Sequence, residues 1–269
     1  IEQHHSLAET YGQEDPAVGC ASFNALNLWL LGFPDQSLGQ LHASQTLSEK
    51  LENPHSAGFA MAFTGIAYQL RRDPLATQKQ ADDLIQFSTE QGLYWIANGT
   101  ILKGWAKSVQ TPDAGNVEMM KHGLRMKREA GANIAVPYFL GLLAEAQLAL
   151  GQIADAQASV KEGLALVEKS RERWFEAELH RMQGELTLEQ DATQQSEAER
   201  CFARSLEVAR EQQAKSLELR AALSLGRLWL QQRRSTEARD LLQPICAWFG
   251  DGVENDELRD ARLLMKLDS

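Results

Sequence analysis

Short turns divide this chain into helical segments that recur in pairs. Helical periodicity is present almost throughout and strand patterns are nearly absent, with breaks at LGFPD, RRDPL, QTPDAG, ALGQ, QQRRS and FGDG. A small or medium-sized residue lies near the middle of each second segment, at successive spacings of 44, 35, 40, 42 and 40 residues: Ser44, Ser88, Gly123, Gly163, Ser205 and Ile245. A two-helix unit that recurs about every 40 residues predicts a solenoid.

The predicted fold is all-α: a tetratricopeptide-like (TPR-like) α-solenoid of about six helical hairpins plus a C-terminal capping helix. One hairpin cannot cover its own apolar face, so neighbouring hairpins stack and share a core. Small residues in the first helices allow this close approach: Ala25, Gly65, Gly104, Ala144, Gly184 and Gly226. We expect a single superhelical domain over residues 1–269, with hairpins at about 18–51, 56–91, 93–130, 135–170, 173–212 and 215–249 and a cap at 255–266.

Charge and cysteine usage narrow the classes of partner. The formal net charge is −10 and no basic run is longer than a pair, which argues against a nucleic-acid partner. No apolar run approaches the roughly 20 residues of a membrane span, so we expect no membrane partner. Cys20, Cys201 and Cys246 lie far apart and form no Cys/His cluster. They are interpreted as small buried side chains in a reducing compartment, which predicts a cytoplasmic protein.

Motifs of catalysis are missing from the sequence. It contains no GxxxxGK[ST] loop, no GxGxxG after a strand, no GxSxG elbow and no HExxH. A paired-helix metal site needs Glu-x-x-His, but Ala177 stands three residues before His180. Glu176 and His180 together would chelate a metal only weakly. We therefore expect a non-enzymatic chain without catalytic residues, metal or cofactor, and a metal-dependent enzyme centred on His180 is the weakest hypothesis.

The repeat also predicts which side chains face the concave surface. In a stacked array, the first helix of each hairpin lines that surface. When the residues of a unit are counted so that its small residue is at place 8, the residues at about places 2, 5 and 9 point into the concave surface. Applied to RWFEAELHRMQGELTLEQ at residues 173–190, these offsets select Glu178, Arg181 and Glu185. One unit earlier they select Tyr138 and Glu145, and one unit later Arg220 and Arg227. Two units earlier they select Asn98 and Trp105.

Two interpretations of this stripe stay open. In the first, the groove binds a peptide or a small polar ligand, with Arg181, Arg220 and Arg227 donating to an anion. In the second, the charges form a ladder of salt bridges between helices, which stabilises little at a surface but fixes the register of the stack.

Several segments of the amino-acid sequence resemble those of one bacterial protein family. The segments DPAVGCASFNALNLWLLGFPDQSL, GLYWIANGTILKGWA, PYFLGLLAEAQLALGQ, RWFEAELHRMQGELTL, AKSLELRAALSLGRLWLQQ and WFGDGVENDELRDARLL follow one another in that order. They are similar to the C-terminal TPR region of multidomain signalling ATPases. In that family a class III adenylate/guanylate cyclase domain, or sometimes a DNA-binding domain, precedes an AAA-like nucleotide-binding module. In related multidomain ATPases of the maltose-regulator type, the helical-repeat region senses an inducer or partner and relieves inhibition of the ATPase.

The resemblance implies a regulatory role. The chain would be a non-catalytic interaction and sensor domain that regulates an upstream ATPase and cyclase, located in the same chain or in another protein. The alternative is a receptor for a small molecule or peptide bound in the concave groove. Because the sequence opens on Ile1, we expect it to be a fragment of a larger protein.

Overall fold

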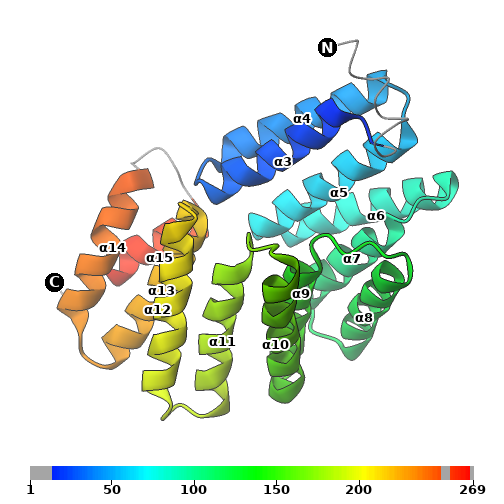
Figure 1. The fold of residues 1–269 in the computed structure, drawn as a ribbon. Helices are drawn as coiled ribbons and strands as arrows, with labels where there is room; N and C mark the ends of the chain where they lie inside the picture. The colour runs from blue at the N-terminus through cyan, green and yellow to red at the C-terminus, as the bar shows by residue number, and fades with distance from the viewer. Residues whose placement is uncertain (1–13, 250–254, 267–269) are drawn as a thin grey trace. The chain divides into compact units, whose positions relative to one another are not determined.

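The predicted all-α, TPR-like fold is confirmed. The computed structural model describes residues 14–249 and 255–266, and these form helices α3–α15 with no strand among them (Figure 1). The helices pair as α3 (Pro16–Leu30) with α4 (Pro34–Lys50), α5 (Pro54–Leu70) with α6 (Pro74–Gln91), α7 (Ile96–Gln110) with α8 (Ala114–Glu129), α9 (Val136–Ala149) with α10 (Ile153–Ser170), α11 (Glu176–Gln190) with α12 (Gln195–Glu211), and α13 (Lys215–Gln231) with α14 (Ser235–Phe249), followed by α15 (Asp256–Leu264).

Local capping explains where the early helices begin. Helices α4, α5 and α6 each start at a proline, which needs no hydrogen-bond partner for its nitrogen and has a backbone φ suited to the first helical turn. The Asn53 side chain accepts a hydrogen bond from the Ser56 amide at 3.0 Å, and Asp73 accepts one from the Ala76 amide at 2.9 Å. These caps satisfy amides that a helix leaves unpaired, so the turn signals of the sequence become fixed helix boundaries.

The chain divides into two compact units. Unit 1 comprises residues 1–29 and 33–134, and unit 2 comprises residues 30–32 and 135–269. The single superhelical domain expected over residues 1–269 stays a prediction. The two units are described separately below.

Aromatic rings hold the helices of unit 1 together. Helices α3 and α5 contain no aspartate, glutamate, lysine or arginine. The rings of Phe59 and Phe63 stack with centroids 4.5 Å apart, and Trp95 meets Phe59 edge-on at 5.4 Å. Leu41 and Leu84 are buried in the same cluster. Burial of this apolar surface is the main stabilising contribution to the unit.

In unit 2, residues of α12 to α15 form one core cluster. Phe202, Leu242 and Leu258 are fully or almost fully buried in one cluster there. Gly184 shows why a small residue recurs in the repeat: a Cβ atom at this position would lie 2.6 Å from the nearest carbon of the Phe202 ring. Helices α11 and α12 can therefore approach this closely only because residue 184 has no side chain.

The three cysteines differ in their exposure to solvent. Cys201 and Cys246 are buried as expected, but Cys20 is exposed, so the expectation of a buried side chain was wrong there. Among residues 14–249 and 255–266, no helix is both long and apolar enough to cross a lipid bilayer.

Candidate functional site

In unit 1, the predicted groove residues are covered by their neighbours. Asn98 is buried and its Oδ1 accepts a hydrogen bond from the Lys127 ammonium at 2.9 Å. Trp105 exposes 0% of its surface, and the Arg72 guanidinium lies 5.4 Å from the centre of its ring. A ligand would have to displace these neighbours to touch either residue. In the structure both side chains serve packing within unit 1, and their role in ligand binding stays a prediction.

Tyr138, in unit 2, is enclosed by aromatic rings. It exposes 0% of its surface, and its ring centroid lies 5.2 Å from that of Trp174 and 5.0 Å from that of Phe175. Trp174 is held in turn by a hydrogen bond from its indole nitrogen to Glu172 at 2.9 Å. The predicted contact between Tyr138 and a ligand is not tested by this geometry, but the rings leave no open surface on it.

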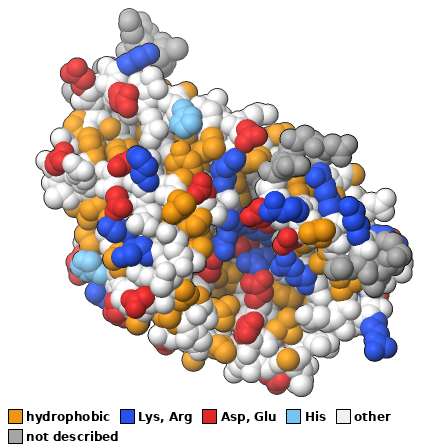
Figure 2. Space-filling view, turned by 180° about the vertical axis from the view of Figure 1, so that it is seen from behind, with side chains coloured by type: hydrophobic (Ala, Val, Ile, Leu, Met, Phe, Trp, Pro, Cys, Tyr) orange, Lys and Arg blue, Asp and Glu red, His pale blue; other side chains and the backbone are white. Residues whose placement is uncertain are grey.

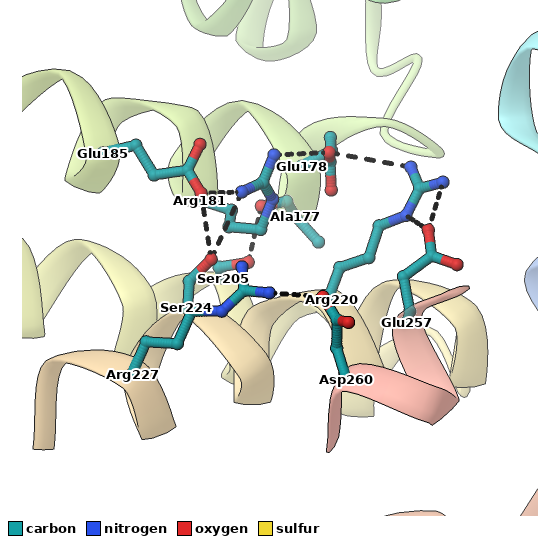
Figure 3. Close-up of polar contacts among 10 residues, drawn as sticks. All are labelled: Ala177, Glu178, Arg181, Glu185, Ser205, Arg220, Ser224, Arg227, Glu257 and Asp260. Atoms are coloured by element: carbon teal, nitrogen blue, oxygen red, sulfur yellow. Dashed lines mark hydrogen bonds and ion pairs between the residues drawn. The ribbon is translucent and has the colours of Figure 1, made fainter. Parts of the chain in front are cut away.

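Arg181 is the centre of the charged part of the predicted stripe (Figure 3). One terminal nitrogen donates to the carboxylate of Glu185 and to the Ser224 hydroxyl, the latter at 3.2 Å. The other terminal nitrogen donates to Glu178 Oε1 at 2.8 Å. The Ser224 hydroxyl donates to Glu185 Oε1 at 3.1 Å and so closes a ring of contacts between α11 and α13. These contacts fix the guanidinium in one orientation.

The electrostatic surroundings hold Arg181 firmly in its charged form. Burial alone lowers the pKa of this guanidinium, because an ion loses solvation away from water. The negative charges of Glu178, Glu185 and Glu145 act in the opposite direction and outweigh burial, so the pKa is raised. Glu145 comes from α9, so carboxylates of two hairpins stabilise the same cation.

Helix α13 extends the charged row toward α15. Arg220 is largely buried and lies between two carboxylates: its Nε donates to Glu257 Oε1 at 3.0 Å, and its Nη1 lies 3.7 Å from Glu178 Oε1. Two turns further along α13, Arg227 donates to Asp260 Oδ2 at 2.6 Å (Figure 3). The ion pairs therefore connect three helices that are distant in sequence: α11, α13 and α15.

The structure brings together most of the charged residues that the repeat offsets selected and adds three others. Glu178, Arg181, Glu185 and Arg220 form one polar network on unit 2, and Arg227 forms an ion pair with Asp260. These contacts fit the salt-bridge ladder of the second interpretation, which stays a prediction. The residues that the offsets missed are Ser224, Glu257 and Asp260. A signal for the last two was present in the sequence, because Glu257 and Asp260 stand three residues apart and share one helix face.

His180 belongs to a separate group on α11. Its Nε2 lies 3.9 Å from Glu176 Oε1, and Arg204 lies 3.7 Å from the same oxygen. Burial lowers the pKa of His180, so the imidazole is neutral at pH 7. Among the residues that the structure describes, no three His, Cys, Asp or Glu side chains gather as metal ligands would.

Charges of both signs are mixed on one face of the molecule. Figure 2 shows lysine and arginine side chains beside aspartate and glutamate side chains on the face turned to the viewer, with hydrophobic side chains between them. Mixed charges at short range favour specific pairing over general attraction to a polyanion.

Comparison with known proteins supports the repeat fold. No family model matches the sequence. An uncharacterized protein of Rhizobium meliloti (strain 1021) is 25% identical over 221 residues, which is 81% of this chain and 21% of that protein. The chain thus spans about a fifth of the length of this relative.

A solved structure shows the same kind of fold. It is a crystal structure of a Signal Transduction ATPase with Numerous Domains (STAND) protein with a tetratricopeptide repeat sensor, from Pyrococcus horikoshii. The TM-score is 0.52 with 7% sequence identity, and the match covers 87% of this chain and 36% of that one. At this identity the likeness concerns the fold alone.

Proposed function

We propose that this chain is a non-catalytic interaction and sensor domain of a larger signalling protein. It would regulate a nucleotide-binding ATPase module, and through it a cyclase, by binding these domains in the same chain or in a partner protein. We place this activity in the cytoplasm. The proposal includes neither a nucleic-acid partner nor a cofactor.

The observation that carries the proposal is the stacked-hairpin fold. The solved protein with a similar fold is a STAND ATPase with a TPR sensor. Repeat arrays of this type present long surfaces built from successive helices, which suit binding to other protein domains. The described polar clusters support the same interpretation, because arginines and carboxylates are paired with one another and fix helix positions.

The test uses the full protein that carries this chain. Removal of residues 1–269 should change the ATPase and cyclase activities at least severalfold, and the separate chain should bind the ATPase module in a pull-down. A loss of activity on deletion could also come from misfolding of the remainder, so the isolated chain should restore regulation when added back. Unchanged activity together with no binding would contradict the proposal.

The second candidate is a receptor for a small molecule or peptide that binds at the first helices of unit 2. It is favoured by the two arginines Arg181 and Arg220, which present oriented guanidinium groups to the same carboxylate, Glu178. A ligand with a carboxylate could replace one of these internal partners. Thermal-shift screening of metabolites and short peptides tests this candidate.

A true ligand of this site should lose its stabilising effect in the variant Arg181→Ala. The matched control is Arg204→Ala, which removes an arginine from the neighbouring helix α12, outside the network of Arg181 and Arg220. A shift that persists in Arg181→Ala, or that is lost equally in both variants, would count against binding at this site.

A further inference from the structure

Helix α15 contacts α13 through two acidic side chains. Glu257 accepts a hydrogen bond from Arg220 at 3.0 Å, and Asp260 accepts one from Arg227 at 2.6 Å (Figure 3). The two acids are three residues apart on α15, and the two arginines are seven residues apart on α13. Both spacings place the side chains on one helix face, so an acidic row of α15 faces a basic row of α13.

The apolar residues of α15 lie next to this acidic row. Leu258, Ala261 and Leu264 are buried in the core cluster of unit 2. Gly226 marks a close approach of α13 to this helix, since a Cβ atom there would lie 3.5 Å from Leu264 Cδ2. Helix α15 thus turns an acidic row and an apolar row toward a basic and apolar face of α13, and its remaining charged residues include Arg259 and Arg262.

We propose that this face of α13 is a docking surface for an acidic amphipathic helix of a partner protein, and that α15 occupies it until the partner helix displaces it. The occupant that the structure shows defines the partner's chemistry: two acidic residues one turn apart, with leucines at the positions of Leu258 and Leu264. The inference rests on the proposed function, because it names the surface through which this interaction domain binds.

The length of α15 makes displacement feasible. It has 9 residues, and isolated helices of fewer than about 12 residues are marginal in water. Its helical form therefore depends on its packing against the rest of unit 2. A longer helix with the same pattern would make the same contacts and would be more stable as a helix on its own.

The position of Arg220 limits the cost of exchange. A buried cation that loses its only partner is strongly destabilising. Arg220 also lies 3.7 Å from Glu178, which in turn accepts a hydrogen bond from Arg181. It therefore keeps a carboxylate nearby when Glu257 moves away. The side chain of Arg227 is 52% exposed, so water can solvate this second arginine.

A peptide in trans tests the proposal with the full 269-residue chain. The probe is a fluorescently labelled peptide with the sequence of residues 255–266, NDELRDARLLMK. Two double variants lose the same two ion pairs: Glu257→Gln with Asp260→Asn on α15, and Arg220→Ala with Arg227→Ala on α13. Only the first keeps the basic surface and weakens its internal occupant.

We expect the α15 variant to bind the peptide at least tenfold more tightly than the unaltered chain, and the α13 variant to bind it more weakly than either. A peptide with Gln and Asn in place of its two paired acids should not bind. Fluorescence polarisation measures the affinities, and circular dichroism checks that both variants retain their helices.

Hydrogen exchange gives a second measurement on the unaltered chain. Excess peptide should accelerate exchange in residues 255–266, because the internal helix is displaced. Equal affinity of both double variants, or unchanged exchange at saturating peptide, would overturn the docking proposal and leave α15 as a fixed cap. Such a result combined with continued binding of the ATPase module would refute this surface and retain the proposed function.

Discussion

The two units build the same helical hairpins with different interactions between their first helices. In unit 1, α3 and α5 lack charged residues, and Phe23, Phe59 and Phe63 form the contacts between them. In unit 2, α11 and α13 contact one another through Arg181, Ser224 and their partners. Stacked hairpins therefore do not require one type of contact, provided that small residues allow the helices to approach.

The two kinds of contact between first helices contribute differently to stability and to specificity. Ring packing buries apolar surface, and the stabilisation from this burial is non-directional and does not change with pH near neutrality. Ion pairs depend on geometry and lose solvation on burial, so their net contribution to stability is smaller. We infer that unit 1 is held mainly by apolar burial, while the charged residues of unit 2 select which helix faces meet. The predictions below test this contrast.

The largest effect is expected from Phe59→Ala in unit 1. Phe59 is buried between Phe63 and Trp95, and loss of a buried phenylalanine side chain costs about 3–5 kcal/mol. Hydrogen exchange analysed peptide by peptide reports each unit separately, and protection should fall in unit 1. The matched control is Phe23→Ala, because Phe23 touches the same rings but is 45% exposed and should cost about 1 kcal/mol. Equal losses would show that the cluster is not the core of this unit.

Next in size is the substitution of a glycine at a close helix contact. In Gly123→Ala of unit 1, the new Cβ would lie 2.9 Å from the Ala97 carbonyl oxygen, and backbone cannot move as easily as a side chain. We expect a loss of about 1–3 kcal/mol, the usual cost of overpacking. Urea unfolding followed by circular dichroism measures the change.

Gly226→Ala in unit 2 is the counterpart. Its new Cβ would lie 3.2 Å from Leu242 Cδ1, the end of a flexible side chain, and alanine gains up to about 1 kcal/mol of helix propensity. We therefore expect a change within about 1 kcal/mol of zero. A larger loss at Gly226 than at Gly123 would contradict the geometry of both contacts.

The fold was predictable because its signals are local. The hairpins were identified from the helical period, from turns with proline and glycine, and from recurring small residues. Each of these signals can be recognised within a stretch of about 40 residues. The offsets also selected Glu178, Arg181 and Arg220, which the structure places in contact with one another. They give the direction of a side chain but not what covers it, so they could not show that Trp174 and Phe175 enclose Tyr138. Likewise, the pairing of Glu257 with Arg220 depends on where α15 docks, which no local pattern specifies.

Acid sensitivity should distinguish the units further, through Glu218. Its side chain is 6% exposed, and burial by itself raises the pKa of this carboxyl. Hydrogen bonds from Lys215 at 2.7 Å and Arg210 at 2.9 Å outweigh burial, so the pKa is lowered below its ordinary value of 4.5. A carboxylate with a lowered pKa stabilises the folded state at pH values above 4.5, and this stability is lost as the pH falls through the folded-state value.

Glu218→Gln should therefore reduce stability at pH 7 by on the order of 1 kcal/mol and flatten its decline below pH 5. Peptide-resolved protection in unit 2, measured from pH 7 to pH 3.5 with correction for intrinsic exchange, checks this. Phe59→Ala, followed on the peptides of unit 1, serves as the control, because it should lower protection there by the same amount at every pH. Parallel pH profiles for Glu218→Gln and the unaltered chain would exclude the assigned role of this carboxylate.

The smallest effect concerns two arginines with left-handed backbone conformations, Arg171 at the C-cap of α10 and Arg72 directly after the C-cap of α5. Arg171 in unit 2 has φ +62° and Arg72 in unit 1 has φ +61°, a region in which glycine avoids the strain of a Cβ atom. Arg171 is exposed, so Arg171→Gly should stabilise the chain by about 0.5–1 kcal/mol. Arg72 also lies over the Trp105 ring at 5.4 Å, a contact worth about 0.5–1 kcal/mol that glycine removes. Arg72→Gly should therefore be close to neutral, and thermal unfolding of the two variants side by side measures the difference. If both substitutions stabilise the chain equally, the contact between Arg72 and the Trp105 ring contributes nothing to the stability of unit 1.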